Sequence, residues 1–287
     1  MQRAVTGGAR LIRDRDLEPS WDLKRAREPG FLRSLTTWVG GPEGHINSNL
    51  GHSAISHACA VGLMRMPVGN RQPGVHVHTV TEIYVILRGE VESFDGVGRV
   101  HRAGPLDCLY IPAGVPHGVR AVGDEDLELV WLHDAVERLG VSLYLEGEGP
   151  FPAEREVELV PFRDLRPEER PARMAAGPGG WSASWVAGPD GSPNHSSGLA
   201  AANGRLGIGL TEVAPGGLHV PHGHGGAALG LVLEGCGVAR IGGEAVEVGP
   251  LDAVYCPPTD LQAIGNPARD KPLRVMWVDE AAATARP

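Results

Sequence analysis

The sequence is poor in cysteine, in positive charge and in long apolar stretches. Its four cysteines stand far apart and none belongs to a Cys-x-x-Cys pair, which argues against a zinc ribbon and a disulfide framework. The 26 basic residues form no block and are outnumbered by 35 acidic ones, so we expect no nucleic-acid partner and no membrane partner. The segment MQRAVTGGARLIRDRD lacks the apolar h-region of a leader peptide, and no run of about 18 apolar residues occurs. We therefore expect a soluble cytoplasmic protein with reduced thiols.

Glycine and proline, in contrast, are abundant, with 41 and 24 residues in a chain of 287. They have no collagen-like period, so they indicate many tight turns between short elements. Segments such as 82–87, 127–132 and 229–233 are short, rich in aliphatic residues and bounded by Gly, Pro or Asp, as strands are. No amphipathic helical pattern of about 12 residues stands out. The prediction is an all-β protein with a sandwich or barrel in each half.

The chain also repeats itself at an offset of about 146 residues. WVGGPEG at 38–44 returns as WVAGPDG at 185–191, and GPLD at 104–107 returns at 249–252, with single-residue drifts such as loop insertions produce. In both copies we expect the tryptophan to be a core anchor and the Gly-Pro step to be a turn. We therefore predict a tandem duplication with domains at 1–150 and 151–287, joined by a polar linker.

Metal-ligating residue types gather in the first copy. His76 and His78 alternate along a strand-like segment and so share one face, Glu82 follows, and His117 lies beyond a Pro-Gly turn. Three imidazoles and one carboxylate suit Fe(II), Mn(II), Ni(II), Co(II) or Zn(II). Four protein ligands leave about two positions of an octahedron open, which favours chemistry on a bound ligand over a structural ion.

The spacing HxHx3Ex6G over 76–89, followed by PxGxxH over 112–117, resembles the two signature motifs of the cupin superfamily. The resemblance covers both halves, so the chain looks like a bicupin with two tandem jelly-roll β-barrels and few short helices. It implies that His76, His78, Glu82 and His117 hold one divalent metal per chain. Two positions depart from the motif without removing a ligand: the glycine of the second motif is displaced to Gly104, and the terminal asparagine is Ala121.

The second copy is a degenerate version of this site. His222 and His224 match the first two histidines, but Ala228 replaces the glutamate and Gln262 replaces the last histidine. Two imidazoles and an amide hold a divalent ion poorly. We expect this copy to serve packing, dimerisation or the shape of the first pocket, with His219 as an alternative ligand.

Several other residues are candidates for substrate contact. Strand parity places Tyr84 on the face of Glu82, as a hydrogen-bond donor, a proton relay or a packed core residue. Arg88 and Tyr110 are weaker candidates, and Met64 and Met66 are expected in an apolar wall. The loop at 45–57, with His45, Asn49 and His52, either covers the pocket or is an ordinary surface loop, which we prefer. His101 and His133 lie outside the motifs and are assigned no role.

The resemblance implies a metal-dependent enzyme that acts on a small organic substrate. The first expectation, by frequency in the superfamily, is a mononuclear non-heme Fe(II) dioxygenase and hence an oxidoreductase. A non-redox isomerase, lyase or aminohydrolase using Mn, Zn or Ni is the alternative, as in the bicupin ureidoglycine aminohydrolases, and a non-catalytic ligand-binding cupin is the third. The same four ligands serve both enzyme classes, so the sequence leaves the reaction open. Pairing through sheet edges makes a homodimer the expected assembly.

Overall fold

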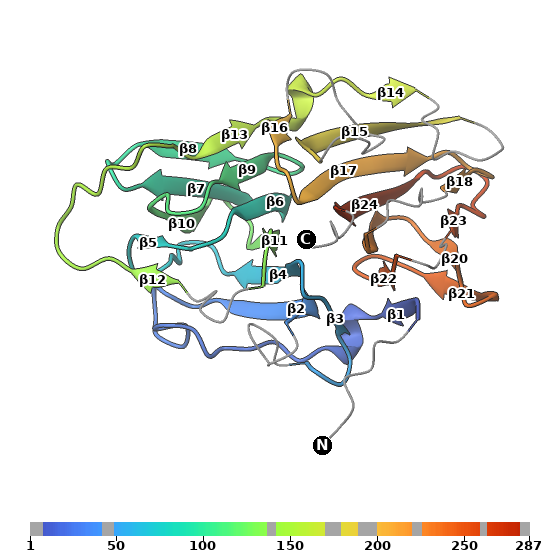
Figure 1. Cartoon of the computed structure of the whole chain (residues 1–287), viewed down its shortest axis with the longest axis horizontal. Coiled ribbons are helices and arrows are strands. Elements are labelled where there is room, and N and C mark those ends of the chain that lie inside the picture. Colours follow the sequence, from blue (N-terminus) through green and yellow to red (C-terminus); the bar gives the residue numbers. More distant parts are fainter. Residues whose placement is uncertain are drawn as a thin grey trace, which may run out of the picture. The chain divides into compact units, whose positions relative to one another are not determined.

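The computed structural model describes residues 8–41, 49–136, 142–169, 179–188, 200–219, 226–258 and 263–281. The chain is built from strands, as predicted, and divides into two compact units (Figure 1). Its described helices are two short 3-10 turns, Asp14–Asp16 and Phe162–Asp164. Within the described ranges no helix has the length and apolar character needed to cross a membrane.

The N-terminal unit, Leu17–Arg163, contains two sheets. The larger sheet has the order β13-β9-β6-β11-β4-β2-β3, and the smaller has the order β12-β5-β10-β7-β8. The larger consists of β2 (Ser34–Gly40), β3 (Ala54–Ile55), β4 (Ala60–Met66), β6 (Glu82–Arg88), β9 (Cys108–Ile111), β11 (Leu127–His133) and β13 (Glu158–Val160). The smaller consists of β5 (His76–Val77), β7 (Glu90–Asp95), β8 (Val100–Ala103), β10 (His117–Val122) and β12 (Leu143–Tyr144). All neighbours are antiparallel except β2 and β3.

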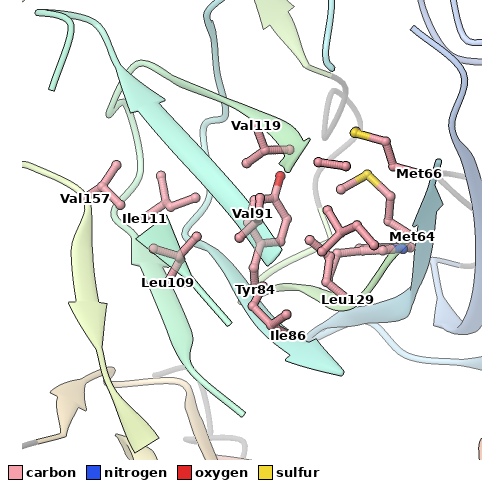
Figure 2. Close-up of a cluster of buried hydrophobic side chains, with 14 of the residues drawn as sticks. Met64, Met66, Tyr84, Ile86, Val91, Leu109, Ile111, Val119, Leu129 and Val157 are labelled. Atoms are coloured by element: carbon pink, nitrogen blue, oxygen red, sulfur yellow. The ribbon is translucent and has the colours of Figure 1, made fainter. Parts of the chain in front are cut away.

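The core of this unit lies between its two sheets. Because side chains alternate along a strand, every second residue faces inward: Tyr84 and Ile86 from the larger sheet meet Val119 and Ala121 from the smaller one. Figure 2 shows this cluster, with the Tyr84 ring among aliphatic and methionine side chains. Met64 and Met66 belong to it, which confirms the expected apolar wall. Two sheets packed face to face around one core are the jelly-roll arrangement.

The C-terminal unit comprises the chain from Asp164 on and the described residues up to Asp16. Its larger sheet has the order β1-β22-β19-β24-β17-β15-β14, with β16 paired to β15, and its smaller sheet has the order β18-β23-β20-β21. The larger consists of β1 (Arg10–Ile12), β14 (Glu168–Glu169), β15 (Gly180–Ala187), β16 (Ala201–Ala202), β17 (Leu206–Val213), β19 (Ala228–Glu234), β22 (Ala253–Cys256) and β24 (Leu273–Glu280). The smaller consists of β18 (Leu218–His219), β20 (Gly237–Ile241), β21 (Glu244–Val248) and β23 (Ala263–Gly265).

The units do not follow the expected boundary near residue 150. Strand β1, from the start of the chain, pairs with β22 in the C-terminal unit, and β13, which follows residue 150, pairs with β9 in the N-terminal unit. The repeat could not reveal this exchange of strands, because sheet-edge pairing depends on which strand end lies nearby in space.

The repeated GPLD tetrapeptide forms the same turn in both units. Leu106 and Leu251 adopt left-handed backbone angles, with φ of 69° and 66°. In each copy an Oδ2 atom of the aspartate accepts the N–H of the glycine at 3.0 Å. A leucine with positive φ is unusual and persists only where the surroundings hold it. The identical geometry supports duplication of one ancestral unit.

The two tryptophans of the WV[GA]GP[ED]G segments are fully buried, which confirms them as core anchors. The Gly-Pro steps expected to follow them as turns lie outside the described residues from 42 and from 189 on.

Candidate metal centre

The four predicted ligands come together at one end of the N-terminal unit. His117, the first residue of β10, is the direct strand partner of His76 on β5 in the smaller sheet. Glu82 is the first residue of β6 in the larger sheet, and His78 lies between β5 and β6. Strand ends from both sheets therefore bring these side chains to one place, and all four are buried.

Their donor atoms are close enough to share one ion. One ligand atom from each of the four residues lies within 4.8 Å of the others. Glu82 Oε2 lies 2.8 Å from His117 Nε2 and 3.1 Å from His78 Nε2. The ring centroid of His76 lies 4.3 Å from that of His117 and 4.9 Å from that of His78.

The hydrogen bonding of His117 leaves a lone pair facing the glutamate. Its Nδ1 lies 2.9 Å from the carbonyl oxygen of Val115, and a carbonyl only accepts, so Nδ1 carries the proton. In a neutral ring Nε2 is then an acceptor, 2.8 Å from a carboxylate oxygen. Two acceptors this close require a positive charge at their junction, either a second proton on the ring or a metal ion. Orientation of a ligating histidine by a backbone carbonyl is usual in metal sites.

His76 gives a second sign of a cation site. Neither of its ring nitrogens has a hydrogen-bond partner among the described residues, although the side chain is fully buried. His78 Nε2 lies 3.1 Å from Glu82 Oε2, but the two groups are not aligned for a hydrogen bond. An unsatisfied buried polar group costs about 1–3 kcal/mol, which a bound metal removes. Burial, reinforced by the neighbouring His117, lowers the pKa of His76 well below its usual value, so the ring is neutral and ready to ligate.

Glu82 is held as a carboxylate. Its burial acts to raise its pKa, but the charge of His78 and the contacts of the carboxylate with His117 and His133 outweigh burial and bring the pKa well below the usual value. The donor set is therefore three imidazoles and one carboxylate, which fits a divalent transition ion.

The structure adds His133, to which the sequence analysis assigned no role. This residue ends β11 and is the direct strand partner of Glu82. Its Nε2 lies 3.3 Å from Oε1, the glutamate oxygen that does not face His117, and its ring lies 4.7 Å from that of His78. Only the pairing of β11 with β6 reveals it, because the two residues stand 51 positions apart. His133 orients Glu82 so that Oε2 points to the ligand cluster.

We expect the substitution His133→Leu to weaken metal affinity by about 10–100-fold, the usual effect of losing an outer partner of a ligand. The dissociation constant for Mn(II), measured by calorimetry on the chelator-stripped protein, tests this. His101→Asn is the matched control, because His101 lies on β8 and contacts none of the ligands in the described structure. Equal affinity of His133→Leu and the wild type would contradict the role.

Tyr84 is buried beside the cluster. Its ring centroid lies 6.5 Å from that of His117, and burial together with the charge of Glu82 raises the pKa of its hydroxyl well above the ordinary value. Among the weaker candidates, Arg88 is exposed at the far end of β6. Tyr110 stands between Leu109 and Ile111 on β9, which both face the core cluster, and does not belong to that cluster itself. Arg88 and Tyr110 both fall outside the ligand cluster.

The loop residues have ordinary surroundings. Asn49 accepts from the backbone N–H of Glu18 and donates to its carbonyl, so it ties two chain segments together. His52 is exposed, and His45 lies outside the described residues. The exposure of His52 agrees with the preferred expectation of a surface loop, whereas Asn49 is buried.

Most of the degenerate second site, including His222, His224 and Gln262, lies outside the described residues. Ala228 is described and begins β19, as Glu82 begins β6. Its strand partner is Asp279, at the position equivalent to His133. His219, the alternative ligand, is buried on β18.

Comparison with known proteins identifies the fold family. The cupin domain model matches residues 62–133 and 209–279, one region in each half. Over 93 residues the chain is 36% identical to dimethylsulfoniopropionate lyase DddQ from Ruegeria pomeroyi. That match spans 32% of this chain and 46% of the relative, so less than half of the relative's length is represented.

Solved structures resemble the whole chain. Protein Ylba from E. coli covers 100% of this chain, with 97% of its own length aligned, a TM-score of 0.65 and 14% identity. A mutant of Bacillus subtilis oxalate decarboxylase covers 99% of this chain with 80% of its own length, at a TM-score of 0.61 and 16% identity. A further structure of that enzyme concerns its Mn(II) centres. At these identities the likeness shows a shared fold.

Proposed function

This chain belongs to the cupin superfamily, with one cupin domain in each half, and from this we propose that its N-terminal unit is a metal-dependent lyase acting on a small carboxylate substrate. The observation that carries the proposal is the buried cluster of three imidazoles and one carboxylate, because one ligand atom from each of the four residues lies within 4.8 Å of the others. His76, His78, Glu82 and His117 would hold the ion. When bound, a divalent ion there supplies Lewis acidity at its open coordination positions.

The choice of lyase rests on the relatives. DddQ is a lyase, and the oxalate decarboxylase is a lyase-type enzyme with Mn(II) centres; both act on small carboxylates according to their names. Neither supports the dioxygenase chemistry or the preference for Fe(II) that the sequence analysis ranked first. The non-redox alternative, with Mn(II) as the first metal to test, is therefore the better supported.

Tyr84 is the residue we assign to proton handling. Its raised pKa keeps the hydroxyl protonated near neutral pH, so it is an acid rather than a base. In a decarboxylation the C–C bond breaks, CO2 leaves, and the electron pair stays on carbon, where it takes a proton. The phenol beside the ligand cluster is placed to donate that proton and becomes a phenolate, which solvent reprotonates. The apolar cluster around the ring excludes competing water (Figure 2).

Substituting Tyr84→Phe is expected to lower kcat by about 100-fold, within the range for loss of a general acid, while metal content stays at the wild-type level. The ring is retained, so the core remains filled. Tyr110→Phe, on the neighbouring strand β9, is the control and should leave kcat unchanged. A Tyr84→Phe variant with wild-type kcat would remove Tyr84 from the mechanism.

The function itself is tested on protein stripped of metal and reloaded anaerobically with Mn(II), Fe(II) or Zn(II). Each form is supplied with oxalate, dimethylsulfoniopropionate and other small carboxylates, and products are followed with and without oxygen. Turnover without oxygen supports a lyase. Turnover that requires Fe(II) and consumes oxygen would overturn the lyase in favour of the dioxygenase.

A further inference from the structure

Arg33 is a buried cation with no acidic partner in the part of the chain that the structure describes. It stands just before β2 and is only 2% exposed. Its guanidinium donates to the carbonyl oxygens of Phe31 at 3.1 Å and Lys24 at 2.9 Å, and to the hydroxyl of Tyr144 at 3.3 Å. All three acceptors are neutral, and among the described residues no carboxylate forms an ion pair with Arg33. Buried arginine is normally paired with an anion, because an uncompensated charge in a protein interior is costly.

Tyr144 connects this cation to the metal centre. It ends β12 and is the direct strand partner of His76, and its ring centroid lies 5.1 Å from that of the histidine. The exposed Lys24 places its Nζ 4.6 Å from the centroid of the same ring. Arg33 donates to the phenol oxygen, and the side chain of Ser142 hydrogen-bonds the same hydroxyl. With both neighbours donating to the two lone pairs of the oxygen, the proton of the Tyr144 hydroxyl is directed to a further acceptor.

The net charge around the metal centre is positive once an ion is bound, which favours binding of an anion there. Arg33 donates to the hydroxyl of Tyr144, whose ring lies 5.1 Å from that of His76, and Glu82 is the one carboxylate of the ligand cluster. The other buried carboxylates of this region are used elsewhere: Asp95 accepts backbone N–H groups of its own turn, and Asp134 accepts that of Thr81. With a divalent ion bound, the single negative charge of Glu82 does not balance the two positive charges of the ion and the one of the Arg33 guanidinium. The protein as a whole carries a net charge of -9, so this positive surplus is local.

We propose that Arg33 and Tyr144, with Lys24 beside them, form an anion subsite next to the metal centre that binds the carboxylate of the substrate. The assignment rests on the proposed function and deepens it, since it names the residues that recognise the acidic end. Tyr144 donates the direct hydrogen bond, and the guanidinium behind it supplies the charge. An anion bound there supplies the missing negative charge and lies within reach of an ion held by His76.

The test uses the Mn(II)-loaded protein and two probes of the same shape, propionate and the neutral propionamide, titrated by calorimetry. Wild-type protein is expected to bind propionate at least about 10-fold more tightly than propionamide, as for hydrogen bonds to a charged group. Arg33→Met should lose that preference, and Arg33→Lys should retain part of it. Manganese content should be equal in all three proteins.

Two further variants are controls, one for misfolding of the arginine variant and one for a general loss of positive charge. Tyr144→Phe retains the ring against His76 and should weaken propionate binding by about 3–10-fold without a change in propionamide binding. Arg65→Met removes an arginine that is already paired with Glu128 on the neighbouring strand, and should leave propionate affinity unchanged. This control separates the subsite from a general loss of positive charge.

Unchanged propionate affinity in folded Arg33→Met, or in Tyr144→Phe if Arg33→Met does not fold, would overturn the subsite. Arg33 would then serve only to brace the turn from Lys24 to Phe31. The readout is equilibrium binding, so it remains informative if no substrate is ever turned over. Loss of the lyase proposal alone, with the propionate preference intact, would leave the anion subsite standing.

Discussion

Replacing Glu82 by glutamine is expected to abolish retention of metal by the purified protein. The amide is neutral and coordinates weakly, so the ion loses its one anionic ligand. We expect the affinity for Mn(II) to fall by more than about 100-fold, beyond the 10–100-fold typical of an outer partner. Elemental analysis after dialysis against a weak chelator measures the effect, and turnover should disappear with the metal.

Control substitutions show whether this loss is specific. Glu90→Gln changes a half-buried glutamate on β7 that is paired with Arg102, and should leave metal content unchanged. His117→Gln makes the first copy resemble the second and should lose metal as Glu82→Gln does. Gln262→Ala, in the degenerate copy, should have no effect. Stoichiometric metal in Glu82→Gln, or equal losses from both copies, would refute a single site in the N-terminal unit.

The substitution Gly62→Ala is expected to cause the largest loss of stability. Gly62 lies directly opposite Trp131 in the pairing of β4 with β11. A Cβ atom there would lie 2.5 Å from the tryptophan ring and 2.1 Å from the backbone oxygen of Thr36. A backbone atom inside a sheet moves only if the strands separate. We therefore expect about 3 kcal/mol of destabilisation, at the upper end for overpacked cores.

The second unit offers an internal replicate of this test. Gly209 lies opposite Trp277, and a Cβ atom there would come within 2.2 Å of that ring, so Gly209→Ala should cost a similar amount. Gly104→Ala is the matched control, since its Cβ would have no atom within 4 Å. Thermal unfolding followed by circular dichroism measures all three variants. A melting temperature of Gly62→Ala equal to that of Gly104→Ala would show that the sheet accommodates the methyl group.

Local patterns were sufficient to predict the strands, the duplication and the four side chains that cluster as a candidate metal site. Alternating or continuous apolar residues between Gly, Pro and Asp predict strands because side-chain direction in a strand follows from position alone. The ligand set could be predicted because His76, His78 and Glu82 are close in sequence, and because the motif resemblance added His117. The inward direction of Tyr84 followed from its parity with Glu82.

What the folded chain added depends on contacts between distant strands. His133 meets Glu82 only through the register of β11 with β6, and Arg33 meets Tyr144 across 111 positions of sequence. Strand β1 joins the C-terminal unit by a pairing for which its three residues carry no distinguishing pattern. Periodicity specifies which way a side chain points, whereas the partner it meets depends on sheet order and register, and these arise only when the whole core packs.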